Sequence, residues 1–181
     1  KVDLGCLTYY VDGEERKRYF LNGMGVGFDA EVCQVTDRMK RIYGGHSWVY
    51  TLSLLIAVFK WKPTSMQLIY DDDSIESDVF TIAVGNGCYS GGGLKQVPAD
   101  PTDGIFFFFL IPRPTFKIII TALSYLFRGE LWNHPACTMK TTKRFKIKNR
   151  QSLLIETDGI MIDGHGPYTA EIIPSALNMI V

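Results

Sequence analysis

The chain has 181 residues, and its 19 Lys and Arg are balanced by 19 Asp and Glu, so the formal net charge is zero. With 46% hydrophobic and 21% charged residues, the composition excludes an intrinsically disordered chain and predicts a single domain over residues 1–181. The neutral balance argues against a nucleic-acid-binding protein, because neutralising phosphates requires a surplus of Lys and Arg.

Neither the cysteines nor the apolar stretches indicate a disulfide scaffold or a membrane span. The cysteines have no Cys-x-x-Cys or zinc-ligand spacing, and we expect mostly buried thiols in a reducing compartment; they are Cys6, Cys33, Cys88 and Cys137. The longest apolar stretch, residues 48–59, is shorter than the roughly 20 residues that span a bilayer. Since the chain opens at Lys1 on a strand-like segment, we expect it to be part of a longer product.

Strand-forming patterns dominate the chain in order, and many of them are consecutive. The predicted strands are residues 3–10, 18–22, 65–70, 79–84, 105–111, 138–148, 152–157, 168–173 and 177–181. Three helices are predicted at residues 28–41, from Ser47 to about residue 59, and between Pro114 and Gly129. Without regular alternation of strands and helices, the pattern predicts a mainly β (α+β) fold, an antiparallel β-sandwich carrying about three helices.

Apolar residues at helical spacing support the second and third helices. In the second helix Ser47 is a candidate N-cap, and positions i, i+3, i+4 and i+7 are apolar, namely Leu52, Leu55, Ile56 and Phe59. In the third helix the apolar face comprises Ile119, Ala122, Leu123 and Leu126.

The glycines Gly23, Gly25 and Gly27 lie between a predicted strand and a helix. A dinucleotide-binding loop would place its third glycine one position later. Asp29 and Glu31 would also repel a pyrophosphate, although they complement the helix dipole. Tight backbone packing is therefore favoured over a cofactor site, and a dinucleotide enzyme is the weakest alternative.

Two charged segments have an ordinary and a functional interpretation. The run 71–73 of three aspartates could bind a cation, but a solvated hairpin loop is favoured. Along residues 138–150, cations alternate with apolar positions, so that one face carries Lys140, Arg144, Lys146, Lys148 and Arg150. This face is either simply solvated or a patch for anionic lipid headgroups, where each cation contributes roughly 1 kcal/mol.

Residues 85–105 combine glycines with polar side chains suited to ligand binding. Three consecutive glycines, 91–93, allow close approach to the backbone, and Lys95 could meet a phosphate. Asp100 and Asp103 lie in a proline-rich turn, where a hard cation could take carboxylate and main-chain oxygens. A plain Asp-Gly turn opening a strand explains the spacing equally well.

The order of these motifs resembles the diacylglycerol kinase catalytic family, specifically the C-terminal domain of bacterial soluble lipid kinases. The matching segments are Asp3-Leu-Gly, 18–22, Gly27-Phe28-Asp29-Ala30, Val84-Gly-Asn86-Gly, 91–95, Pro98-Ala99, Asp103-Gly104, Asp158-Gly159 and 173–177. The resemblance implies the second, β-sandwich domain of a two-domain enzyme that transfers the ATP γ-phosphoryl group to a lipid hydroxyl. The Gly-Gly-Asp-Gly-Thr signature of the family's nucleotide-binding N-terminal domain is absent here.

The resemblance also implies cofactors, partners and site residues. Mg²⁺ would be held by Asp103, Asp100 and the main-chain carbonyl of Ile105, while Asn86 and Lys95 would contact the substrate. ATP would be bound mainly by the chain's own N-terminal domain, and the lipid would be met at the cytoplasmic membrane surface; a homodimer is left open.

The family's general base is the glutamate of an Asp-Gly-Glu motif, which here reads Asp158-Gly159-Ile160. Because isoleucine cannot accept a proton, Asp158, Asp163 or His165 could stand near the hydroxyl instead. The alternative function is a catalytically inactive lipid-binding or regulatory module.

Overall fold

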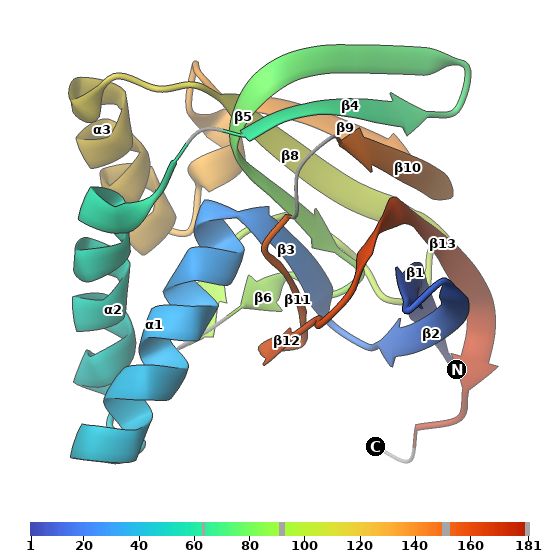
Figure 1. The fold of residues 1–181 in the computed structure, drawn as a ribbon, viewed down its shortest axis with the longest axis horizontal. Coiled ribbons are helices and arrows are strands. Elements are labelled where there is room, and N and C mark those ends of the chain that lie inside the picture. The colour runs from blue at the N-terminus through green and yellow to red at the C-terminus, as the bar shows by residue number, and fades with distance from the viewer. Residues whose placement is uncertain (63, 91–92, 150–152, 180–181) are drawn as a thin grey trace.

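The structure, a computed structural model, describes residues 1–62, 64–90, 93–149 and 153–179. Within them the chain forms one curled antiparallel sheet of eleven strands with three α-helices gathered on one side (Figure 1). Neighbouring strands along the sheet are β12 (Ile160–Met161), β11 (Ile155–Thr157), β3 (Gly23–Gly27), β5 (Asp73–Gly85), β4 (Thr64–Tyr70), β10 (Arg144–Asn149), β13 (His165–Leu177), β1 (Val2–Val11) and β2 (Glu14–Phe20). The predicted mainly β fold with about three helices is confirmed.

Two further strands and one separate hairpin complete the β-structure of the described residues. β8 (Phe106–Pro112) pairs with β5 and with β9 (Thr138–Thr142). A separate two-stranded hairpin joins β6 (Tyr89–Ser90) to β7 (Leu94–Lys95). Residues 91 and 92, two of the three consecutive glycines expected to allow close approach to the backbone, lie outside the described residues.

The long strand β5 connects the two layers of the curl. Its first half pairs with β4, and its second half pairs with β3 on one side and β8 on the other. Ile82 and Val84 enter the core inside the curl, whereas Phe80 and Ala83 pack under the helices. The strand is therefore apolar on both faces, as a central strand is expected to be.

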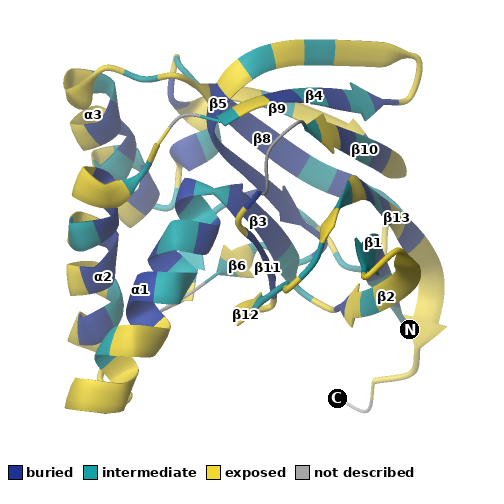
Figure 2. Cartoon of the chain, viewed as in Figure 1, coloured by how far each residue is buried: buried dark blue, intermediate teal, exposed yellow. Residues whose placement is uncertain are grey.

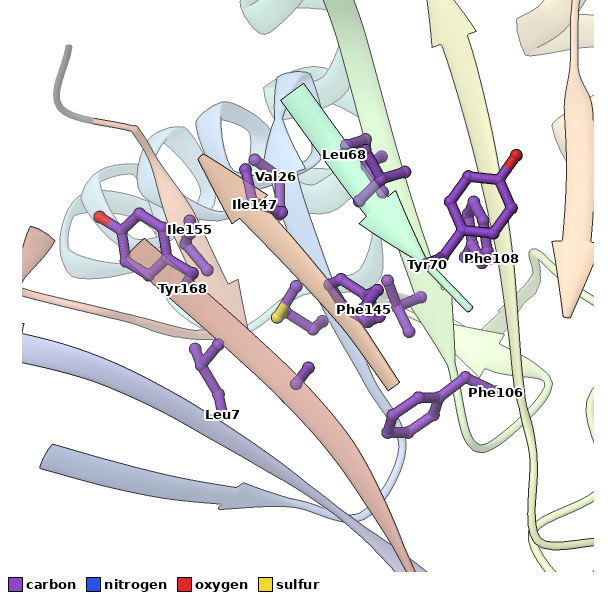
Figure 3. Packing of buried hydrophobic residues seen from close by; sticks show 14 of the residues in the cluster. Leu7, Val26, Leu68, Tyr70, Phe106, Phe108, Phe145, Ile147, Ile155 and Tyr168 are labelled. Carbon is purple, nitrogen blue, oxygen red and sulfur yellow. The ribbon is translucent and has the colours of Figure 1, made fainter. Parts of the chain in front are cut away.

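The core inside the curl is rich in aromatic side chains from strands far apart in sequence (Figure 3). Phe106, Phe108 and Phe145 form a chain of ring contacts, with centroid distances of 6.1 Å and 6.4 Å to Phe145. Burying each such ring contributes roughly 1.5–3 kcal/mol, so this core closes the curled sheet.

The helices are α1 (Phe28–Tyr43), α2 (Ser47–Lys60) and α3 (Phe116–Phe127). The prediction for α3 is confirmed, since Ile119, Ala122 and Leu126 are buried. Thr115 caps its first turn by accepting a hydrogen bond from the backbone N–H of Ile118, and Gly129 follows its end with a φ of 71°, a conformation that favours glycine.

The second predicted helix is present as α2, but its predicted apolar stripe is not the face that packs. The buried residues are Val49, Ser53, Leu54, Ala57 and Val58, while Leu52, Leu55 and Phe59 are exposed and Ile56 is partly exposed. The N-cap residue is His46 rather than Ser47. Figure 2 shows the exposed outer stripe of α2 beside its buried inner one. Because α2 is apolar on two faces, its periodicity alone could not indicate which face meets the sheet.

Other predicted boundaries also change. Gly23–Gly27 is itself a strand, buried between β5 and β11. The predicted strand 138–148 divides at Lys143 into β9 and β10, which pair with different neighbours. The predicted strand 168–173 is part of the longer β13, which ends at Leu177, so the predicted strand 177–181 overlaps β13 at that residue alone. Of the predicted strand 152–157, residue 152 lies outside the described residues, and residues 153 and 154 precede β11. Residues 180 and 181 lie outside the described part.

Two sequence expectations about the class of protein can be compared with the structure. Cys6 is buried, the other three cysteines are partly buried, and all four are free thiols. Among the described helices, none combines the length and the apolar character needed to cross a membrane.

Candidate functional site

A cavity of about 420 Å³ opens where α1 and α2 cover the end of the sheet formed by β3 and β11. Its wall comes from α1, Tyr50 of α2, the start of β3, the end of β5, parts of the segment from Gly87 to Val97, and β11 with the turn that follows it. The polar and titratable side chains lining it are Asn22, Asp29, Cys33, Thr36, Asp37, Lys40, Tyr50, Tyr89, Ser90, Gln96, Glu156 and Asp158.

Two carboxylates, Asp29 and Glu156, approach one another over Gly25 of β3. A Cβ atom on Gly25 would overlap the Asp29 carboxylate and would lie 2.7 Å from Glu156 Oε1. Any residue larger than glycine would displace these groups. The sequence prediction of tight packing at the glycine segment thus has a specific cause: Gly25 makes room for two acidic side chains.

Local structure places each carboxylate. Asp29 is in the first turn of α1, and its Oδ1 accepts a 3.4 Å hydrogen bond from the Gln96 side chain. Strand alternation puts Ile155 in the core and turns Glu156 to the opposite face, toward α1. Glu156 Oε2 accepts a 2.7 Å hydrogen bond from the Gly159 N–H.

Burial raises the pKa of both carboxyls, and the Asp29 charge raises that of Glu156 further. The pKa of Glu156 rises to about 8, mainly because burial disfavours the charged form and then because of the Asp29 charge; the Gly159 and Gly25 N–H groups oppose the rise. Burial also raises the pKa of Asp29 to about 6. Two close carboxyls in one cavity retain a proton near neutral pH, so the pair can accept or donate one there.

Asp158, predicted as a catalytic residue, has a structural task at the cavity edge. Its carboxylate accepts hydrogen bonds from the backbone N–H groups of Leu21, Asn22 and Gly23, at 2.7, 2.9 and 2.9 Å. These bonds join the β11–β12 turn to the start of β3, and they occupy both carboxylate oxygens.

The other predicted catalytic candidates are not in the cavity. Asp163 is exposed and does not line it. His165 is also exposed and stacks on Tyr10 at 6.3 Å between ring centroids. Ile160 is 51% exposed and lies outside the cavity wall.

The two predicted substrate contacts, Asn86 and Lys95, also lie outside the cavity wall. Asn86 is fully buried, and its Nδ2 donates to the carbonyls of Asp3 and Leu21 at 2.9 and 2.7 Å. Lys95 lies over the Trp132 ring, 5.5 Å from its centroid. Asn86 thus connects three segments of backbone, and Lys95 makes a cation–π contact.

The predicted Mg²⁺ residues lie together on one exposed turn. The Asp103 N–H donates to the Asp100 carbonyl, and Asp103 Oδ1 accepts from the Ile105 N–H at 3.0 Å. The buried Asp3 carboxylate supports this turn by accepting from the Gly104 N–H at 2.7 Å. Two carboxylates and a carbonyl suit a hard cation that keeps several waters. Within the described ranges, no group of three or more acidic, His or Cys side chains forms a tighter cage.

The predicted cationic face is divided between strands. Arg144, Lys146 and Lys148 lie on β10 and Lys140 on β9, while Arg150 lies outside the described residues. Phe145 and Ile147 face the core, as predicted.

Sequence reasoning missed Glu156 and gave Asp29 no chemical role beyond repelling a pyrophosphate. One signal was available: Glu156 is a charged residue in the short buried strand Ile155–Thr157, directly before the Asp158-Gly159 turn. Buried glutamates are rare unless they are paired or functional.

Comparison with known proteins identifies the family. Residues 22–181 match the model of the YegS C-terminal NAD kinase beta sandwich-like domain, and the chain belongs to this family. It is 31% identical over 114 residues to a Chromohalobacter salexigens protein named "Probable lipid kinase YegS-like", covering 62% of this chain and 33% of the relative. It is 26% identical over 183 residues to the Bacillus subtilis protein named "Putative lipid kinase YtlR", covering 97% of this chain and 59% of the relative.

Solved structures show the same fold. A crystal structure described as "a putative diacylglycerol kinase from Bacillus anthracis str. Sterne" superposes with a TM-score of 0.71 at 22% identity, covering 96% of this chain and 53% of that one. The resemblance to a C-terminal domain of the diacylglycerol kinase catalytic family is thereby confirmed. The chain spans from a third to three fifths of the length of these relatives.

Proposed function

We propose that the chain is the lipid-side domain of an ATP-dependent lipid kinase, which phosphorylates diacylglycerol or a related lipid alcohol. The observation that supports this proposal most directly is that a polar cavity adjoins an apolar one. The polar cavity shares Asp29, Val32, Tyr50 and Gln96 with a smaller cavity of about 40 Å³, whose other lining is almost entirely apolar. A lipid alcohol that places its hydroxyl in the polar cavity would turn the adjoining carbon atoms toward this apolar wall, while its hydrocarbon chain would extend beyond the smaller cavity. The names of the relatives point to the same class.

The nucleotide side of the reaction is assigned to a separate N-terminal domain. ATP would be bound mainly there, and Mg²⁺ would be held by Asp100, Asp103 and the Ile105 carbonyl, where it would neutralise phosphate charge. Because the relatives are longer than this chain, we expect the chain alone to transfer no phosphoryl group. No nucleic-acid partner is proposed.

The test is phosphoryl transfer from labelled ATP to dispersed diacylglycerol, comparing the chain with the full-length gene product. The full-length protein should label the lipid and the isolated chain should not. Robust transfer by the isolated chain, or none by the full-length protein with any lipid alcohol, would refute the proposal.

The substrate would be reached at a membrane surface, and the outer face of α2 and α3 supports this. This face is defined by Trp48, Leu52, Leu55 and Phe59 of α2 with Phe116, Ile120 and Phe127 of α3, all exposed. Phe59 is 81% and Phe116 60% exposed, and their rings lie 6.5 Å apart.

The charges around this face suit an anionic bilayer. Residues 38–70 and 104–129 contain no Asp or Glu, and they carry Arg38, Lys40, Arg41, Lys60, Lys62, Arg113, Lys117 and Arg128. An apolar surface bordered by cations inserts between headgroups and meets anionic lipid electrostatically. This face is therefore a better candidate for the membrane contact than the divided cationic face of β9 and β10.

Vesicle sedimentation tests the membrane contact. Phosphatidylglycerol-containing vesicles should retain the chain, and Phe59→Ser should weaken retention several-fold. Tyr19→Ser, which removes a 56% exposed aromatic residue from β2, is the matched control and should bind like wild type. Equal retention of both variants would exclude the α2–α3 face.

The second candidate function is a catalytically inactive lipid-binding or regulatory module, which Ile160 favours. If so, the full-length protein should bind lipid without phosphorylating it, and Ile160→Glu should raise its turnover strongly. Efficient turnover by the unmodified protein would exclude this alternative.

A further inference from the structure

The proposed phosphoryl transfer needs a group that removes the proton from the lipid hydroxyl. Ile160 cannot do so and lies outside the cavity wall. Asp158 already accepts three backbone hydrogen bonds, and Asp163 and His165 are exposed elsewhere. The proton acceptor must therefore be sought among the other residues of the cavity.

Glu156 lies next to the turn on which the family carries its base. β11 pairs with β12 so that Glu156 lies opposite Met161 and Thr157 opposite Ile160. The 2.7 Å hydrogen bond from the Gly159 N–H to Glu156 Oε2 anchors the carboxylate under this turn, and the side chain lines the cavity. The Glu156 carboxylate therefore lies close to position 160 in the strand pair, and unlike Ile160 it lines the cavity.

The remaining titratable groups of the cavity serve less well. Burial raises the pKa of the Cys33 thiol to about 12, and its Sγ donates to the Gly159 carbonyl at 3.0 Å. Burial also raises the pKa of Tyr50, and Lys40 is cationic. The titratable and charged side chains that share the cavity with Glu156 are Asp29, Cys33, Asp37 and Lys40 of α1, Tyr50 of α2, Tyr89 of β6 and Asp158 of the turn after β11.

We propose that Glu156 is the general base of this domain, taking the proton of the lipid hydroxyl into the cavity, and that Asp29 is the positioning residue that keeps Glu156 basic. In the step, the hydroxyl O–H bond breaks and its proton goes to Glu156. The oxygen forms a bond to the γ-phosphorus of ATP while the bond from that phosphorus to the β–γ bridging oxygen breaks, releasing ADP. The inference rests on the proposed lipid kinase function.

The raised pKa of Glu156 suits this role, because a stronger base removes a hydroxyl proton more effectively. The acidic limb of the pH–rate profile should then have an apparent pKa near 8. Removing the Asp29 charge, which contributes to the rise, should move this limb to lower pH.

The test measures kcat, lipid KM and the pH–rate profile of the full-length protein with ATP and dispersed diacylglycerol. Glu156→Gln should lower kcat by 100-fold or more, change KM little and abolish the limb near pH 8. Asp29→Asn should shift the limb toward acid.

Glu31→Gln is the matched control, since it removes a carboxylate from the same first turn as Asp29 but outside the cavity wall. It should leave the profile unchanged. If Glu156→Gln retains kcat within a few-fold and keeps its acidic limb, the assignment of the base is wrong while the kinase function stands. If the wild-type protein phosphorylates no lipid alcohol, the proposed function itself fails, and this role for Glu156 fails with it.

Discussion

The buried carboxyl pair predicts that the domain loses stability as the pH rises, and Glu156→Gln tests this without any enzymatic assay. In the folded chain the pKa of Glu156 is about 8, against an ordinary value of 4.5. The folded state therefore holds a proton that the unfolded chain has lost between these pH values. The stability is fully present below about pH 4.5 and is lost progressively as the pH rises toward 8.

The size of the loss follows from the displacement of the pKa. At 1.36 kcal/mol per pKa unit, the rise from 4.5 to about 8 corresponds to at most about 5 kcal/mol. Because Asp29 shares the cavity and the two titrations interact, we expect about 2–5 kcal/mol from the pair. Glutamine stays neutral and can still accept the hydrogen bond from the Gly159 N–H.

Urea unfolding of the chain at pH 5, 6, 7 and 8 measures the effect. The wild-type free energy of unfolding should fall over this range, and that of Glu156→Gln should fall much less, so the variant becomes the more stable protein at pH 8. Glu76→Gln, at an exposed position of β5, should run parallel to wild type. A constant difference between wild type and Glu156→Gln at every pH would refute the reasoning.

Three further predictions test the supports of the site. Asp158→Ala leaves three backbone N–H groups without their acceptor and should cost about 2–4 kcal/mol in urea unfolding; a loss below 1 kcal/mol would contradict this. Gly25→Ala should lower the free energy of unfolding by about 1–3 kcal/mol through overpacking. It should also change the pH dependence of unfolding, because the added methyl group displaces Asp29 and Glu156. An unaltered pH dependence would show that the two carboxylates do not meet over Gly25. Asp103→Ala should weaken Mg²⁺ binding in a calorimetric titration, and unchanged affinity would remove the metal assignment.

The sequence alone was sufficient for the fold class and most elements, because these depend on local patterns. The apolar face predicted for α3 includes Ile119, Ala122 and Leu126, and all three are buried. The alternation of Phe145 and Ile147 with cations likewise assigned the inner face of β10 correctly. The order of short motifs also indicated the family before any contact was known.

Where two local solutions were available, only the tertiary structure decided between them. On α2 the apolar residues Leu52, Leu55 and Phe59 do line one face, but this face is exposed. The other apolar face, which includes Leu54 and Val58, packs on the rest of the protein. The strand predicted through Lys143 has the same alternating pattern on both sides of this residue. It is divided because its first half, β9, pairs with β8, whereas its second half, β10, pairs with β4 and β13.

The candidate site belongs wholly to the tertiary structure. Asp29 and Glu156 are far apart in the chain and share no motif, and they meet because β3 and β11 are neighbours in the sheet and Gly25 leaves room between them. The raised pKa of each comes mainly from burial, and that of Glu156 also from the Asp29 charge; no local pattern carries these properties. The sequence thus determined the strands, the helices and the family, whereas the packing of distant segments decided which side chains face the cavity.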